Sequence, residues 1–252
     1  MTYYNTKQSE KIFILLIISM FLSLWSFGTV TAQILDAEAN EQKYTMALQA
    51  IENDDYPLAS SLLTELGGYK DSLGQLYNYR TQRINNARSL GDEKKYTEAY
   101  NILTVMEGVY EADYLLKEIQ KADKYDQALI AVELDDYLKA SELFNDIGNY
   151  SDSYTRFYNY KNERINTAKQ LASEKRYSEA YAILTPMEGV YEADYVLTQI
   201  KNEDKYAQAL LAIEQDDYAT VSDLLTEISG YSILAILKMI QLMDMEHFTV
   251  VL

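Results

Sequence analysis

This sequence contains no cysteine, and that absence excludes several chemistries at once. Without thiols the chain cannot form disulfides, bind a metal through Cys or be anchored to a membrane as a lipoprotein. His247 is the only histidine, so neither a His-based metal site nor a catalytic triad can be built. No Gly-rich phosphate loop is present either. We therefore expect no catalytic residues, no cofactor and no metal site, and we do not expect an enzyme.

Proline and glycine are also scarce, with 2 Pro and 9 Gly in 252 residues. This composition favours helices over β structure, which needs many tight turns. The hydrophobic fraction of 48% is enough for a packed core and too high for general disorder. The sequence predicts an all-α fold.

Basic side chains are outnumbered, since 22 Lys and Arg face 39 Asp and Glu, for a net charge of −17. Such an acidic chain is poorly suited to binding nucleic acid or anionic lipid. If it binds a partner, we expect a protein or peptide that is basic or polar. The sequence gives no indication of the oligomeric state.

A targeting segment over residues 1–32 precedes the fold. Lys7 and Lys11 stand before an uncharged apolar run over residues 12–30. Val30 and Ala32 are small residues suited to cleavage before Gln33, which is typical of a signal peptide. The run is also long enough to span a bilayer as a retained membrane anchor. Both alternatives stay open, and both predict an extracytoplasmic location for the rest of the chain, secreted or membrane-anchored.

The segment MEGVYEADY occurs twice, at residues 106–114 and again at residues 187–195. Its longer flanks, residues 86–119 and 167–200, also agree at most positions, so the chain contains an internal repeat. We interpret MEGVY as the end of a short helix, its Gly cap and a Tyr that packs at the turn. EADY then begins a long helix, with its acidic residues near the positive end of the helix dipole.

This repeat unit is itself double, because a 40–41-residue pattern recurs twice within it. The markers of the pattern are Tyr56, Tyr96, Tyr137, Tyr177 and Tyr218. An Ala stands nine positions before each marker, and small or apolar residues stand three, seven and ten positions after it. Steps of three and four residues put the later positions on one stripe of a short helix. Longer helices are expected between the short ones, for example over residues 71–90, where Arg80 and Arg83 interrupt the apolar period.

Glycine and aspartate mark the predicted helix ends. The glycines that follow a short helix, where a left-handed cap favours Gly, are Gly67, Gly68, Gly108, Gly148, Gly189 and Gly230. The pairs Asp54-Asp55, Asp135-Asp136 and Asp216-Asp217 precede short helices, so we interpret them as capping residues and not as calcium ligands or catalytic acids. Asp71-Ser72 and Asp152-Ser153 are predicted to cap the long helices in the same way.

The repeated pattern Tyr-x-x-Ala-x-x-x-Leu/Phe resembles the second helix of a tetratricopeptide repeat (TPR). The segments GYKDS at residues 68–72 and GNYSDS at residues 148–153 are similar to divergent repeats of exported proteins from Gram-positive bacteria. The resemblance covers residues 43–231, with a longer repeat than usual and without the terminal Pro of the usual motif. It implies a right-handed α-solenoid of about five helical hairpins over residues 33–232, whose long helices line a concave binding surface.

The last segment, residues 233–252, departs from the pattern because it is apolar on nearly every face. Lys238, Gln241 and Asp244 argue against a second membrane span. A docking helix, a membrane-surface segment and a truncated or frame-shifted end are the alternatives, and we favour the last.

These features predict a non-catalytic, exported or membrane-anchored scaffold for protein–protein interaction. The alternative is a cell-wall carbohydrate-binding module that stacks tyrosines on sugars. Most of the 24 tyrosines are expected to pack between helices, with the hydroxyl bonded at an edge. The tyrosines off the marker positions, which are the candidates for sugar stacking, are Tyr79, Tyr100, Tyr158 and Tyr181.

Overall fold

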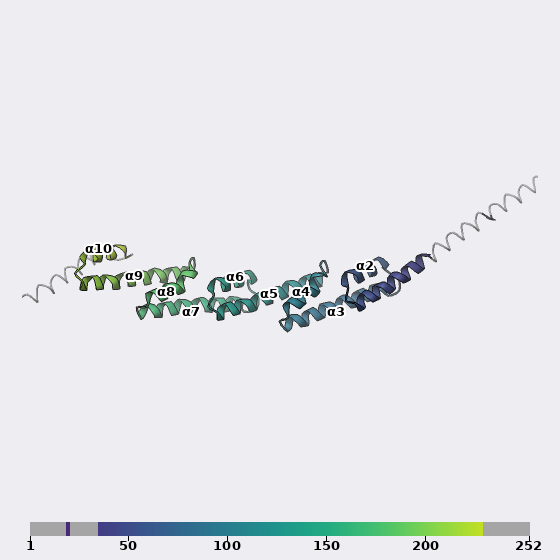
Figure 1. The fold of residues 1–252 in the computed structure, drawn as a ribbon, viewed down its shortest axis with the longest axis horizontal. Helices are drawn as coiled ribbons and strands as arrows, with labels where there is room; N and C mark the ends of the chain where they lie inside the picture. Colours follow the sequence, from purple (N-terminus) through teal and green to yellow (C-terminus); the bar gives the residue numbers. More distant parts are fainter. Residues whose placement is uncertain (1–18, 21–34, 229–252) are drawn as a thin grey trace, which may run out of the picture. The chain divides into compact units, whose positions relative to one another are not determined.

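A computed structural model describes residues 19–20 and 35–228, and within these residues all regular secondary structure is helical (Figure 1). A first helix spans residues 35–52. The elements that come after it along the chain are α2 (Tyr56–Leu66), α3 (Ser72–Asp92), α4 (Tyr96–Thr104), α5 (Tyr110–Glu133), α6 (Tyr137–Ile147), α7 (Ser153–Ser173), α8 (Tyr177–Leu184), the 3-10 helix η1 (Thr185–Met187), α9 (Tyr191–Glu214) and α10 (Tyr218–Glu227). Short and long helices alternate, and each marker Tyr is the first residue of its short helix. Consecutive helices pack in pairs, with α3 on α4, α7 on α8 and α9 on α10. The all-α prediction is confirmed.

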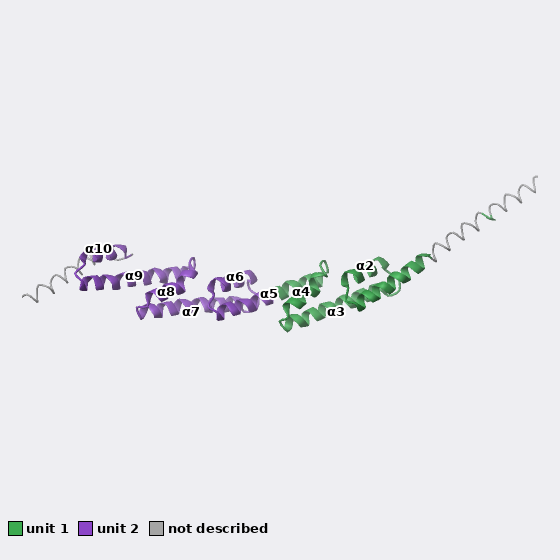
Figure 2. Cartoon of the chain, viewed as in Figure 1, with its two compact units in different colours: residues 1–120 green, residues 121–252 purple. Residues whose placement is uncertain are grey.

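The chain divides into two compact units, residues 1–120 and residues 121–252 (Figure 2). The division falls within α5. Each unit has its own apolar core, and each contains one copy of the polar network described below.

The predicted apolar stripe is buried in every repeat. The alanines before the markers are Ala47, Ala87, Ala128, Ala168 and Ala209, and each is at most 1% exposed. Burial of such small residues lets neighbouring helices approach closely. The large stripe residues, all buried, are Leu63, Leu66, Leu103, Met106, Phe144, Ile147, Leu184, Met187, Leu225 and Ile228. The 40–41-residue pattern is therefore a packing pattern.

The glycine prediction is confirmed at four positions with positive φ: Gly67, Gly108, Gly148 and Gly189. Their φ angles are 53°, 85°, 58° and 89°, a region that L-residues with a side chain rarely adopt. Gly68 does not have positive φ, so the prediction is wrong there, and Gly230 lies outside the described residues.

The interpretation of MEGVY needs one correction. Tyr110 and Tyr191 do not pack at the turn but begin α5 and α9 with 78% and 79% of their surface exposed. Met106 and Met187 supply the packing instead, since both are fully buried. The first residue of a helix that starts at a turn can point away from the hairpin contact, and here it does.

No helix in residues 19–20 and 35–228 is both long enough and apolar enough to cross a membrane. The targeting segment, residues 1–32, lies outside the described residues except for residues 19 and 20. The divergent segment 233–252, with His247, also lies outside them.

Candidate binding surface

The second aspartate of each Asp-Asp pair caps the short helix that follows it. The side chain of Asp55 accepts a hydrogen bond from the backbone N of Leu58 at 3.1 Å. Asp136 accepts from Lys139 N at 3.0 Å, and Asp217 repeats the contact in α10. Each bond satisfies a backbone N–H that the helix itself leaves unpaired. The capping interpretation is confirmed for these three residues.

The first aspartate of each pair does not cap the short helix, so the capping interpretation is wrong for it. Asp216 accepts a hydrogen bond from Tyr218 Oη at 3.2 Å, whereas the first aspartates of the other two pairs bind a long helix. Asp54 has a φ of 56°, and its side chain bonds to α3. There its Oδ1 accepts hydrogen bonds from Tyr79 Oη at 2.8 Å and from Arg83 Nη1. We call this arrangement the Asp–Tyr–Arg network.

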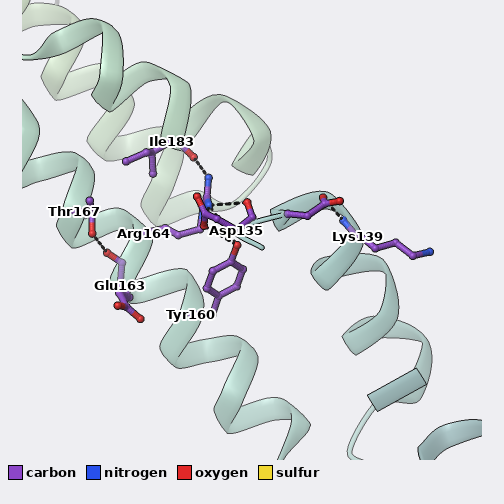
Figure 3. A network of polar contacts seen from close by, with 8 residues as sticks. Asp135, Lys139, Tyr160, Glu163, Arg164, Thr167 and Ile183 are labelled. Carbon is purple, nitrogen blue, oxygen red and sulfur yellow. Dashed lines mark hydrogen bonds and ion pairs between the residues drawn. The ribbon is translucent and has the colours of Figure 1, made fainter. Parts of the chain in front are cut away.

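The second unit contains the same network (Figure 3). Asp135, also at a φ of 56°, accepts from Tyr160 Oη at 2.9 Å and from Arg164 Nη1. Arg164 Nη2 donates to the backbone oxygen of Ile183 at 2.9 Å. A single guanidinium on α7 therefore links the turn between α5 and α6 to the short helix α8.

Burial is uneven across the network. The Arg83 and Arg164 side chains are 8% and 7% exposed, whereas Asp54 and Asp135 are 69% and 66% exposed. Each guanidinium also lies 5.6 Å from two tyrosine ring centroids, a cation–π distance; for Arg164 the rings are those of Tyr137 and Tyr160. The exposed carboxylate thus pairs with a buried cation that also lies near two aromatic rings.

The network shifts the ionisation of its members. Burial, together with the hydrogen bond to the aspartate, raises the pKa of both Tyr79 and Tyr160 to about 12. Burial acts to raise the pKa of Asp54, but the hydrogen bonds from Arg83 and Tyr79 outweigh it and lower that pKa. The tyrosines are therefore neutral donors at physiological pH.

Sequence reasoning missed the two arginines, since the apolar period marks Arg83 only as an interruption. Spacing could have revealed them. In both copies the Arg follows a Tyr by four residues and the first Asp of a pair by 29 residues. The sequence places Gln241 and Met245 where a third copy beside Asp216 would need Tyr and Arg.

The predicted caps at Asp71 and Asp152 are also wrong. Neither side chain makes a capping bond to its long helix. Asp71 accepts instead from Tyr44 Oη and from Gln75 Nε2, the latter at 2.8 Å. Asp152 accepts from Tyr125 Oη in the same way. A tyrosine hydroxyl from the preceding long helix has replaced the backbone N–H as the donor.

The four tyrosine candidates separate into buried and exposed ones. Tyr79 is buried in the network, and Tyr100 is half-buried against the core of the first unit. Tyr181 is half-buried and donates to Asp204 Oδ2 at 2.7 Å, and its burial and this bond raise its pKa. Of the four, Tyr158 is the one with an exposed side chain, at 52%. Tyr79 is buried and leaves no open ring face for a sugar, so the expectation of sugar stacking is wrong for it.

The exposed tyrosines of the described residues, apart from Tyr218 at the start of α10, lie at one place, in the first two turns of the long helices. The pairs are Tyr110/Tyr114 on α5, Tyr154/Tyr158 on α7 and Tyr191/Tyr195 on α9, with Leu73/Tyr77 at the equivalent place on α3. Residues four apart lie on the same side of a helix. The rings of Tyr154 and Tyr158 are stacked, with centroids 6.4 Å apart and planes 12° apart. We call the three tyrosine pairs the exposed aromatic pairs.

A groove of about 800 Å³ lies in the second unit, between the end of α7, the start of α8 and the second half of α9. Its walls include Tyr177, Leu210 and Leu211. Both leucines are exposed, at 42% and 55%. This groove and the exposed aromatic pairs are apolar surface that the described helices leave exposed.

Within residues 19–20 and 35–228, no group of three or more His, Asp or Glu side chains could hold a metal ion. A comparison of the chain with family models, with curated proteins and with solved structures finds no match.

Proposed function

We propose that this chain is a non-catalytic, exported or membrane-anchored scaffold that binds a protein or peptide. Its hairpins form a right-handed, TPR-like solenoid, and its partner is basic or polar. In this proposal the long helices carry the binding surface and the short helices support them.

The observation that carries the proposal is the recurrence of the exposed aromatic pairs. Packing explains the buried stripe, but it does not explain large aromatic side chains held in water at the same place on successive long helices. Exposed apolar groups that gather on a surface mark interaction sites, and Tyr is enriched at such sites. A chain of net charge −17 adds attraction for a basic partner.

The test is a peptide array of varied charge and hydrophobicity, probed with the full chain. The wild-type chain is expected to bind basic and mixed peptides, and binding should weaken with salt because exposed charges are screened over about 8 Å at physiological ionic strength. Replacing the pairs on α5, α7 and α9 by serine should reduce binding. Leu58→Ser and Leu138→Ser, which change exposed leucines on short helices, are the matched controls.

A wild-type chain that binds no peptide on the array would refute the scaffold. Equal binding by the serine variants and the controls would show that the aromatic pairs are not the binding surface. Affinity that holds or rises with salt would remove the charge argument and leave recognition to apolar contacts.

The second candidate function is a cell-wall carbohydrate-binding module. The observation that favours it is the exposed, nearly parallel stack of Tyr154 and Tyr158, because sugar rings pack on flat aromatic faces. Sedimentation with purified cell-wall polysaccharide distinguishes the two candidates. Co-sedimentation that Tyr154→Ser with Tyr158→Ser abolishes, in a chain that binds no peptide, would favour the carbohydrate function.

A further inference from the structure

The groove in the second unit combines an apolar wall with an acidic edge. Leu210 and Leu211 lie on α9, and Tyr177 begins α8 opposite them. These three side chains are partly or largely exposed, so the groove is lined by apolar surface that no described residue covers completely. Its volume of about 800 Å³ is in the range of pockets that enclose several side chains.

The charges around the groove are unbalanced. Glu203, Asp204 and Glu214 line it from α9, and Lys175 is the single basic side chain among its lining residues. Glu203 and Glu214 are exposed, so their carboxylates face solvent beside the apolar wall. A ligand with positive charges flanking apolar groups would complement this surface.

The turn at Lys175 also lacks the link that closes the preceding turn. On α7, Tyr160 and Arg164 bind Asp135, whereas Ile200 and Asp204 stand at the same spacings from Lys175, on α9, and α9 contains no Arg. Lys205 pairs with Glu227 on the next short helix at 3.0 Å. No arginine of α9 is therefore available to fill the space beside this turn.

We propose that this groove binds a peptide segment in which apolar side chains alternate with Lys or Arg. The apolar side chains pack on Tyr177, Leu210 and Leu211, and the cations pair with Glu203 and Glu214. This inference rests on the proposed scaffold function and assigns it one site and one class of partner. A second copy of the chain fits poorly, because two chains of net charge −17 repel each other.

The test uses three labelled peptides of equal length: alternating Leu and Lys, alternating Leu and Glu, and alternating Ser and Lys. Fluorescence anisotropy measures their binding to the full chain. The Leu–Lys peptide is expected to bind at least about tenfold more tightly than the other two, because only it can both pack on the apolar wall and pair with the acidic side chains of the groove. Equal binding by the Leu–Lys and Ser–Lys peptides would overturn the apolar part of the proposal.

Two double variants localise the site. Leu210→Ser with Leu211→Ser should weaken Leu–Lys binding about tenfold, and Glu203→Gln with Glu214→Gln should weaken it about fivefold and flatten its salt dependence. Glu52→Gln with Glu163→Gln, which neutralises two exposed acids elsewhere, is the charge control. Leu138→Ser is the apolar control, and thermal melts show whether each variant is folded.

The outcomes separate this inference from the scaffold itself. If every variant binds the Leu–Lys peptide as the wild type does, the groove is the wrong site but the scaffold stands. If the wild type binds no peptide here or on the array, the scaffold falls as well.

A photo-reactive amino acid in place of Leu211 identifies the occupant directly. Cross-links to the Leu–Lys peptide support the proposal. Cross-links that persist in excess peptide and map to a second copy, or to residues 233–252 of the same chain, would overturn it.

Discussion

Two kinds of turn precede the short helices, and the difference between them is chemical, not conformational. Two of the acidic junctions are Asp54–Tyr56 and Asp135–Tyr137, and the basic junctions are Lys94–Tyr96 and Lys175–Tyr177. In all four the first residue has positive φ, between 56° and 62°. The repeat thus fixes the backbone turn, while the side chains decide what the turn binds.

Only the acidic junctions connect the turn to the following long helix through a buried arginine. They also cap the short helix with their second residue. At the basic junctions the capping positions are Lys95 and Arg176, and neither makes a side-chain capping bond. Arg176 pairs instead with Glu179 in the first helical turn, at 2.6 Å. The same backbone conformation is therefore bonded to the next long helix at the acidic junctions and is a turn without that bond at the basic ones.

The largest difference in stability is expected when the first residue of each kind of junction is replaced by glycine. Asp135→Gly should lower the free energy of unfolding by about 2 kcal/mol, because the buried Arg164 loses its carboxylate acceptor and hydrogen bonds to charged groups are worth about 1.5–3 kcal/mol. The exposed carboxylate keeps this below the larger cost of breaking a fully buried pair. Chemical denaturation of the full chain measures the effect.

Lys175→Gly is the matched control for that substitution. It should raise the free energy of unfolding by about 0.5 kcal/mol, because Gly relieves the positive φ and no buried cation depends on Lys175. The pair Asp54→Gly and Lys94→Gly repeats the comparison in the first unit. Changes of the same sign at Asp and Lys sites would mean that the network contributes nothing to stability.

Packing, in contrast, should be equivalent before both kinds of junction. Ala87 and Ala168 precede basic junctions, Ala128 precedes an acidic one, and all three have no exposed surface. Ala→Leu at each should lower the free energy of unfolding by about 1–3 kcal/mol through overpacking. Thermal melts measure the loss, with exposed Glu→Gln variants as neutral controls. Unchanged stability at Ala87 and Ala168 would show that the helices do not approach closely there.

Alkaline pH should weaken the acidic junctions. Tyr79 and Tyr160 have pKa values raised from 10.0 to about 12, so folding keeps a proton that the unfolded chain releases earlier. Their contribution is complete below about pH 10 and is lost as the pH rises to about 12, at about 1.4 kcal/mol per pH unit for each tyrosine.

Denaturation at a series of pH values compares the wild type with Tyr79→Phe and Tyr160→Phe combined. The difference between the two chains should shrink across this window. Tyr114→Phe, at an exposed position, controls for the loss of a hydroxyl. A difference that stays constant from neutral pH to about pH 12 would contradict the burial of these hydroxyls beside aspartate.

The smallest difference in stability between the two kinds of junction is expected at the capping positions. Asp136→Ala should lower the free energy of unfolding by about 1 kcal/mol, because it removes the acceptor for the Lys139 N–H. Lys95→Ala should change it by less than about 0.5 kcal/mol, since no capping bond is lost. Equal losses at the two positions would mean that the capping bond itself is not what stabilises the short helices.

The sequence by itself determined the period, the helical class and the buried stripe. Ala168, Leu184 and Met187 are buried where their spacing predicted, because contacts at steps of three and four residues are set by helix geometry alone. The turn glycines followed for a similar reason, since positive φ is a local requirement that Gly meets most easily. Both features depend on local periodicity and local backbone preference, which can be predicted from a single sequence.

Only the tertiary structure decided what the polar residues do. Asp135 and Asp136 are neighbours of identical type, yet one caps α6 and the other binds an arginine 29 residues away. Tyr160 is buried and Tyr191 is exposed, although both are tyrosines of long helices. These roles depend on which helix lies opposite each side chain. That arrangement is a property of the packed hairpins, and no step of three or four residues encodes it.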